Sequence, residues 1–255
     1  MNGILLAIQF FTAIPLQKEF PLGRKEVTSM YIALPFVGAA IGFGMFAVAE
    51  LFSEGMGLGT LLTAVAVVTT GIVLTGGLHL DGWADTGDAY FSYRDQAKRH
   101  EIMDDPRLGA FGTMALVLLV LVKVALLHEF LSSDAGWSYL YFLLIPFLAR
   151  AGMNIFFVAV PLAKDKGIAH FFKEKMAGKG IIGVSIVASL LLLAIIGFMT
   201  NQIGMAASLA AVLSGALLLF RKWTIKNFGG VSGDLCGAFI EGAEVLLWFV
   251  VIVFI

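Results

Sequence analysis

The chain has 255 residues, of which 59% are hydrophobic and 14% are charged, and its mean hydropathy is +0.93. These values lie far from the balance of a soluble domain and predict an integral membrane protein. The formal net charge of −1 gives no overall preference for nucleic acid. Cys236 is the only cysteine, which excludes an intramolecular disulfide and a cysteine-based zinc site.

Seven apolar stretches approach or exceed the roughly 20 residues that a helix needs to cross a bilayer. They cover residues 30–52, 58–78, 109–131, 137–162, 181–200, 204–220 and 237–255. The opening run, residues 4–16, is shorter and is interrupted by Gln9, Thr12 and Pro15, which indicates an N-terminal interfacial or re-entrant helix. We therefore predict an all-α fold, a polytopic integral membrane helical bundle with about seven transmembrane helices. The sequence contains no linker or repeat, so residues 1–255 are predicted to form a single membrane-embedded domain.

Basic residues gather in alternate connections between the predicted spans. Of the 17 Lys and Arg residues, 15 lie in residues 17–29, 79–108, 163–180 and 221–236, and the intervening connections carry none. The positive-inside rule places these basic connections in the cytoplasm. The connection after the second span is therefore predicted to be cytoplasmic, and with seven spans the C-terminus lies on the opposite side.

The stretch "GGLHLDGWADTGDAY", residues 76–90, places three aspartates directly after the second predicted span. Asp81, Asp85 and Asp88 are spaced i, i+4 and i+7, so in a helix they fall within an arc of roughly 60°. Three like charges there need a cation, and oxygen ligands suit a hard ion such as Mg²⁺. The alternative is a solvated acidic loop, but the apolar flanks and the helical spacing favour a metal site. His79 points away from Asp81 and is a candidate for contact with a substrate or a neighbouring helix.

The same connection ends in "EIMDDPRLGAFG", residues 101–112. Arg107 is the best candidate here for binding a phosphate, because a guanidinium group offers a planar fork of donors. Asp104 is a candidate metal ligand, as is Asp105. Either could instead cap the turn that follows.

A further polar patch, "GGVSGDLCGAFIEGAE" at residues 229–244, lies on the same predicted side of the membrane. Gly229, Gly230 and Gly233 allow a backbone turn that cradles a phosphate of the substrate. Asp234 and Glu241 share a helix face at i and i+7, which makes them candidates for a second metal site, and Asp234 also for substrate contact. Glu241 is expected about one turn inside the membrane, where a carboxylate needs a cation or a basic side chain as its partner.

Two basic residues fall within predicted spans. Arg150 is a candidate partner for buried carboxylates or for a phosphate of the substrate. Lys123 is interpreted as a contact with a neighbouring helix or as a side chain that snorkels to the boundary. The lysine-rich connection 163–180 is interpreted as a topology signal or a contact with anionic lipid headgroups, with steering of an anionic substrate as the alternative.

Three motifs, in this order and spacing, carry a resemblance to a known family: "GGLHLDGWADTGDA", "EIMDDPRLGAFG" and "GGVSGDLCGAFIE". They resemble the motifs of the cobalamin synthase family, also called adenosylcobinamide-GDP ribazoletransferase. The resemblance covers essentially the whole chain, including "FFTAIPL" and "LPFVGAAIG". The family often has arginine where this chain has Ala13 and threonine where it has Ser232, so no role is assigned to those two positions.

The resemblance implies a Mg²⁺-dependent enzyme of the cytoplasmic (inner) membrane, multi-pass, with a cytoplasmic active face. Its substrates would be a corrinoid nucleotide, adenosylcobinamide-GDP, and α-ribazole or α-ribazole 5′-phosphate. The ribose 3′-hydroxyl of α-ribazole or of α-ribazole 5′-phosphate would attack the cobinamide-side phosphorus. This attack would release GMP and form adenosylcobalamin or adenosylcobalamin 5′-phosphate. Whether the chain forms a homo-oligomer stays open.

The resemblance also suggests roles for the candidate residues. The aspartate spacing is similar, more loosely, to that of the CDP-alcohol phosphotransferases, in which the last aspartate is thought to act as the base, so Asp88 is the implied base here. The expected metal ligands are Asp81, Asp85 and Asp88, while Arg107 would bind a phosphate, and Asp234 and Glu241 would add a second metal or a basic partner.

Three other functions remain open at this point. A phospholipid synthase similar to the CDP-alcohol phosphotransferases would consume CDP-diacylglycerol instead of cobinamide-GDP. A cation transporter would more often place its carboxylates at mid-membrane on broken helices and show inverted repeats. A scaffold subunit would tolerate asparagine at all three aspartates of the motif.

Overall fold

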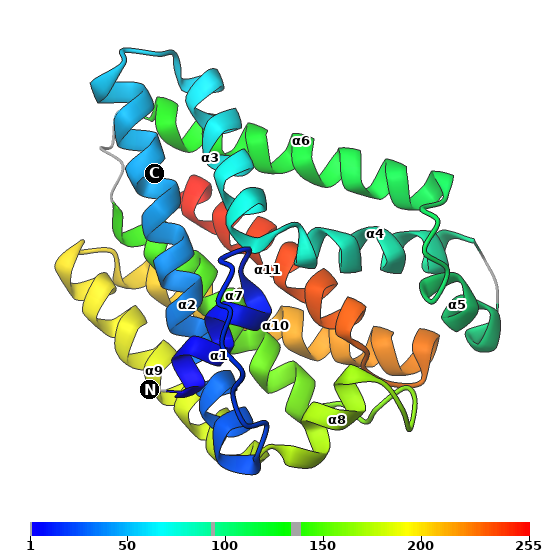
Figure 1. The fold of residues 1–255 in the computed structure, drawn as a ribbon. Coiled ribbons are helices and arrows are strands. Elements are labelled where there is room, and N and C mark those ends of the chain that lie inside the picture. Colours follow the sequence, from blue (N-terminus) through cyan, green and yellow to red (C-terminus); the bar gives the residue numbers. More distant parts are fainter. Residues whose placement is uncertain (1, 93–94, 134–138) are drawn as a thin grey trace.

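The computed structural model describes residues 2–92, 95–133 and 139–255, and within these ranges the secondary structure is helical apart from one isolated bridge between Leu162 and Val231. The elements are α1 (Asn2–Phe11), α2 (Arg24–Glu50), α3 (Thr60–Thr75), α4 (Leu78–Phe91), α5 (Gln96–Met103), α6 (Ala110–Ser132), α7 (Tyr139–Ala159), α8 (Ile168–Lys175), α9 (Gly178–Met199), α10 (Ile203–Phe228) and α11 (Gly233–Phe254). One turn of π-helix, Leu51–Gly55, extends α2. The prediction of an all-α bundle is confirmed (Figure 1).

Six helices in the described part of the chain are long and apolar enough to cross a membrane, and α3 with α4 makes a seventh if the bent pair counts as one span. The chain is therefore a multi-pass membrane protein. The predicted stretches overlap these helices, although the first two residues of the stretch 137–162 lie outside the described ranges. The stretch 58–78 covers α3 and the bend after it, and it counts as a span only together with α4. α2 begins at Arg24 and α10 continues to Phe228, because hydropathy marks only the apolar part of a helix whose polar end extends beyond the lipid.

The core of the bundle surrounds α7, which packs against α2, α9, α10 and α11. Most α7 side chains are buried, and hydrophobicity on every face is typical of such a central helix. Aromatic rings fill the space beside it: Phe142 contacts Phe130 and Trp248 edge-on, with centroids 5.8 and 5.4 Å away. Edge-to-face pairs of this kind stabilise packing beyond the area that they bury. α7 thus forms a rigid centre against which the other helices are held.

A sharp bend separates α3 from α4, whose axes differ by 94°. Gly76 and Gly77 form the bend with φ of 63° and 74°, the left-handed region that glycine adopts without strain. The amide of Gly77 donates to the carbonyl of Ile72 at 3.0 Å and so closes the end of α3. Beyond the bend, α4 lies between α6 and α11 (Figure 1) and carries the aspartate motif. The motif is helical, as its i, i+4, i+7 spacing predicts.

Candidate active site

Close contact between α4 and α11 positions the carboxylates. A Cβ atom at Gly82 would lie 2.5 Å from the carbonyl oxygen of Asp234, so only glycine permits this crossing. On the other side of α4, the indole N–H of Trp83 donates to the carbonyl of Ala115 on α6 at 3.0 Å. Small residues that let backbones touch are typical of helix contacts in membranes. As a result, two motifs about 150 residues apart in the sequence meet at one place.

Two aspartates of the α4 motif border a cavity of about 670 Å³, here called the acidic cavity. Asp81 and Asp85 line it from α4, and Asp104 and Asp105 line it from the segment after α5. The negative charges of Asp81, Asp234 and Asp88 all act on the half-buried carboxylate of Asp85. Among the described residues that border this cavity there is no lysine or arginine. Anionic ligands therefore need a cation to bind here.

Asp88 has a different neighbourhood from Asp81 and Asp85. Its Oδ1 accepts the backbone N–H of Gly112 at 3.1 Å, in the first turn of α6. A carboxylate at this place satisfies one of the free amides of the helix and interacts favourably with the helix dipole. Asp88 does not line the acidic cavity. Its predicted roles as base and metal ligand stay predictions.

Asp104 and Asp105, which line the acidic cavity, each form an ion pair with a basic side chain. Asp105 accepts from Arg107 Nε at 2.9 Å and from Nη2 at 2.7 Å, and these hydrogen bonds lower the pKa of Asp105 to about 2. The Arg107 side chain is otherwise exposed to solvent. Asp104 accepts from Lys164 Nζ at 2.6 Å. A phosphate contact by Arg107 and a metal contact by Asp104 stay predictions.

A second cavity of about 610 Å³ adjoins the first and is here called the aromatic cavity. Asp81 and Asp104 line both cavities. Asp234 lines the aromatic cavity, together with the buried His79, whose Nε2 has no hydrogen-bond partner in the described part of the chain. His79 also packs against α11, since its backbone lies 3.0 Å from where a Cβ of Gly237 would be.

Two of the three glycines predicted to cradle a phosphate have structural roles here. Gly229 ends α10 with φ of 75°, and its amide donates to the carbonyl of Ile225. A Cβ at Gly230 would lie 2.5 Å from the backbone of Leu162, where the chain crosses the segment after α7. Neither glycine borders the two cavities. The third glycine, Gly233, borders the aromatic cavity, and phosphate binding by the three glycines stays a prediction.

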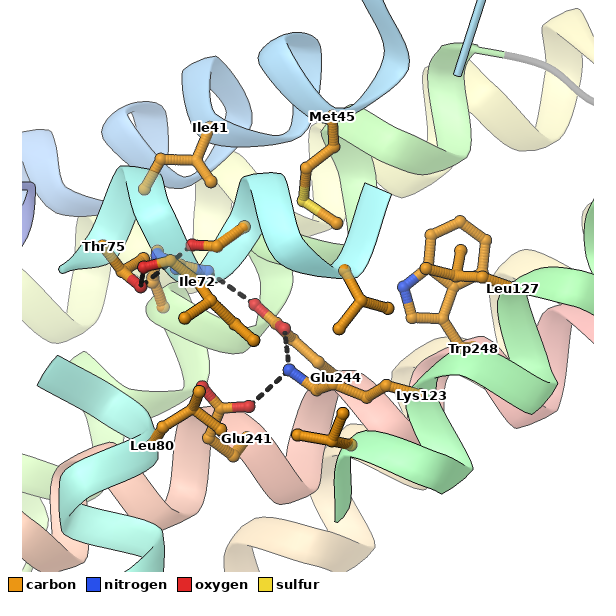
Figure 2. A pocket seen from close by; sticks show the side chains of 14 residues that line it. Ile41, Met45, Ile72, Thr75, Leu80, Lys123, Leu127, Glu241, Glu244 and Trp248 are labelled. Carbon is orange, nitrogen blue, oxygen red and sulfur yellow. Dashed lines mark hydrogen bonds and ion pairs between the residues drawn. The ribbon is translucent and has the colours of Figure 1, made fainter. Parts of the chain in front are cut away.

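Inside the bundle, four charged side chains form what we call the ion-pair network. Figure 2 shows the ammonium group of Lys123, from α6, between the carboxylates of Glu241 and Glu244, both from α11. Arg150 on α7 donates to Glu244 at 2.8 Å and to the carbonyl of Pro146 at 3.1 Å. Two cations therefore balance two anions, as buried charges require.

The ion-pair network shows at least one partner for each of three charged residues that the sequence places in or near the membrane. Glu241 has a basic partner, Lys123, and Arg150 has a buried carboxylate partner, Glu244. Lys123 contacts a neighbouring helix, as predicted. Neither Glu241 nor Arg150 lines the acidic cavity, so a metal contact by Glu241 and a substrate contact by Arg150 stay predictions.

The residues of the acidic cavity suit Mg²⁺ only in part by themselves. Their donors are all carboxylate oxygens, which this ion prefers. Among the described residues, no three His, Cys, Asp or Glu side chains are gathered closely enough to form a metal site. Mg²⁺, however, usually binds through one or two protein carboxylates together with waters and substrate phosphates. The donor set thus fits an ion that a phosphorylated substrate completes.

The fold and the site together define a class of protein: a multi-pass helical membrane protein with a cavity that carboxylates border. The model of the family described as "Cobalamin-5-phosphate synthase" matches residues 3–252. The chain belongs to this family, and it is an enzyme of the transferase class.

Curated relatives agree with this assignment. An adenosylcobinamide-GDP ribazoletransferase of Geobacillus thermodenitrificans (strain NG80-2) is 37% identical over 253 residues, which is 98% of this chain and 95% of the relative. The protein of the same name from Geobacillus kaustophilus (strain HTA426) is 36% identical over 98% of this chain and 95% of its own length. No solved structure matches the chain at a significant level. The family resemblance of the three motifs is confirmed.

Sequence reasoning missed several side chains of these sites. Glu244 lies three residues after Glu241 on α11, and this helical spacing could have indicated a second acidic partner for Lys123. Tyr31, Phe157 and Phe172 of the aromatic cavity come from three separate helices. No local pattern marks them, because they resemble ordinary core residues.

Proposed function

We propose that this enzyme transfers the adenosylcobinamide-phosphate group of adenosylcobinamide-GDP to α-ribazole or its 5′-phosphate, with release of GMP. Family membership supports the late step of cobalamin synthesis, and the curated relatives carry the name of this reaction. The observation that carries the proposal is the acidic cavity, which Asp81 and Asp85 line and in which the negative charges of Asp81 and of Asp234 both act on Asp85. This arrangement suits a diphosphate that enters together with a divalent cation.

The proposed reaction breaks the phosphoanhydride bond of the diphosphate and forms a new phosphoester bond to the ribose. A ribose hydroxyl attacks the cobinamide-side phosphorus, the bond from that phosphorus to the bridging oxygen breaks, and GMP leaves with the bridging oxygen. Mg²⁺, held by Asp81 and Asp85 when bound, would neutralise the diphosphate and stabilise the leaving phosphate. Transfer of this kind depends mostly on positioning and on charge stabilisation.

Asp81 is also the candidate for accepting the proton of the hydroxyl, through the carboxylate oxygen that would not bind Mg²⁺. It lines both cavities, so it lies where a ligand in one meets a ligand in the other. A base must be within hydrogen-bond reach of the proton that it removes. Asp88, the base implied by the spacing of the motif, instead accepts the amide of Gly112. The position of Asp81 therefore supports it better in this role.

We also propose that the site opens to the cytoplasm in the cytoplasmic (inner) membrane. Lys164 and Lys166 border the aromatic cavity, in a connection that carries five lysines. Cytoplasmic connections are enriched in such residues. Both substrates would then reach the site from the cytosol.

The test is an assay of GMP release from adenosylcobinamide-GDP by the purified chain in liposomes, with α-ribazole and Mg²⁺. We expect release that needs both, that stops with a chelator, and that falls by about a hundredfold or more in Asp85→Asn. Asp165→Asn, an exposed aspartate in a connection, is the matched control and should keep the rate. Release by wild-type protein that is unaffected by a chelator, or absent altogether, would contradict the proposal.

A further inference from the structure

The aromatic cavity has a wall of four rings from four different helices. Tyr31 of α2 stacks on Phe157 of α7, with centroids 5.4 Å apart and planes 25° from parallel. Phe172 of α8 meets Tyr31 edge-on at 6.1 Å, and Phe10 of α1 meets Phe172 at 5.2 Å. All four residues border the cavity. A planar aromatic ligand can stack on such a wall, which binds bases through their π faces.

A buried polar group faces the same cavity. His79 is 3% exposed, and its Nε2 has no partner in the described residues. Leaving a buried nitrogen without a hydrogen bond costs free energy, so native structures rarely do so. A ligand with a ring nitrogen or a hydroxyl group would supply the missing partner. The cavity therefore suits a ligand that is both aromatic and able to hydrogen-bond.

The volume of the aromatic cavity indicates which of the two substrates it can hold. A volume of about 610 Å³ lies within the range of about 300–1,000 Å³ typical of small-molecule pockets. A benzimidazole nucleoside is of that size, whereas a corrin macrocycle with its side chains and nucleotide is much larger. The larger substrate can therefore present only its diphosphate to the acidic cavity. The nucleoside can enter the aromatic cavity completely.

The cavities meet at Asp81, which lines both. Asp81 and Asp234 line the same cavity as Tyr31 and Phe172, so a nucleoside whose base lies against these rings can place its ribose at the carboxylates. Its hydroxyl would then reach the boundary where the diphosphate of the other substrate lies. Such an arrangement would bring the nucleophile directly against the electrophile, with Asp81 beside both.

We infer that the aromatic cavity is the binding site of the acceptor nucleoside, with its benzimidazole base against Tyr31 and Phe172, a hydrogen bond to His79, and its ribose at Asp81. This inference rests on the proposed function, because the acceptor is taken from it. Tyr31, Phe172 and His79 are then the residues that determine which base is accepted.

The test measures equilibrium binding of α-ribazole to the full chain in lipid nanodiscs, followed by the fluorescence of the benzimidazole. Phe172→Ala should weaken binding by about tenfold, the usual effect of removing one stacking ring. His79→Leu should weaken it as well, and His79→Gln should restore part of the loss because glutamine can still hydrogen-bond. Phe156→Ala, an equally buried ring that borders neither cavity, is the matched control and should leave binding unchanged.

Asp85→Asn separates this inference from the proposed function. This variant should bind α-ribazole like the wild type although it no longer releases GMP. If the wild type releases GMP but Phe172→Ala and His79→Leu bind α-ribazole normally, the inference is wrong and the proposed function stands. If wild-type protein neither binds α-ribazole nor releases GMP, both fail.

A second measurement needs no substitution and therefore does not depend on variants that fold. Irradiation of the wild type with an azidobenzimidazole riboside should label peptides of α8 and of the first half of α2, and excess α-ribazole should prevent it. Labelling confined to the segment after α5, which borders the acidic cavity, would overturn the inference. So would displacement of the probe by added phospholipid instead of by α-ribazole, because it would identify a lipid chain as the occupant.

Discussion

The contact between α4 and α11 at Gly82 gives the sharpest test of how the site is built. Substitution Gly82→Ala places a methyl group 2.5 Å from the carbonyl oxygen and 2.9 Å from the Cα of Asp234. Ordinary van der Waals contacts begin at 3.4 Å, so α4 must move away from α11 by about 0.9 Å. Both neighbours are backbone atoms, which cannot rotate away as a side chain can.

This displacement should affect activity more than stability. Overpacking of this size typically costs about 1–3 kcal/mol of unfolding free energy, whereas a misplacement of about 1 Å in a reacting group can reduce a rate by about 10²-fold. We therefore expect Gly82→Ala to remain folded in liposomes with its GMP release lowered by about that factor. The fall should appear in kcat, because Asp81 and Asp85 move away from Asp234.

Gly215→Ala is the control for this experiment. Gly215 lies in α10 with no atom within 4 Å of the position that a Cβ would take, so alanine should be neutral or stabilise the helix by about 0.5–1 kcal/mol. Thermal unfolding and GMP release are measured for both variants. A Gly82→Ala variant with the rate of the wild type would refute the view that this helix contact positions the carboxylates.

Three further outcomes are expected. Lys123→Met should destabilise the protein by about 3–5 kcal/mol, because it leaves two buried carboxylates with one cation. In thermal unfolding, the double variant Lys123→Met/Glu241→Gln should recover most of this loss. Equal destabilisation of the single and the double variant would contradict the ion-pair network. Asp88→Asn should leave the free energy of unfolding unchanged, whereas Asp88→Ala should lower it by about 0.5–2 kcal/mol because α6 loses its cap. An Asp88→Asn variant that is stable but releases no GMP would assign the role of base to Asp88 instead of Asp81. At low salt, Lys166→Gln should lower the association rate of α-ribazole 5′-phosphate more than that of α-ribazole, and this difference should vanish at high salt. Equal effects on both ligands would exclude electrostatic steering by this lysine.

The helices and the acidic face of α4 follow from the sequence because hydropathy and helical spacing are local properties. The stretch 109–131 became α6 almost unchanged, and Asp81 and Asp85 lie on one helix as predicted. The sequence does not indicate what the glycines of the motif contact. The structure shows that Gly82 admits the backbone of α11, which lies about 150 residues away in the sequence.

Partners across the bundle could not be predicted from local patterns. The pairing of Lys123 with Glu241 and Glu244 joins α6 to α11, and the capping of α6 by Asp88 depends on how α4 packs against it. A charge near the membrane must have a partner, but the sequence does not indicate which of several opposite charges it meets. Only the packing of the helices decides this.

The bend at Gly76 and Gly77 also determines the depth at which the enzyme works. α3 has 16 residues, so it rises about 24 Å at 1.5 Å per residue, which is less than the roughly 30 Å thickness of the hydrocarbon layer. If the proposed function is correct, the diphosphate would bind below the level of the lipid headgroups. Bilayers with longer acyl chains would increase this depth, so turnover should depend on lipid thickness even though no lipid takes part in the chemistry.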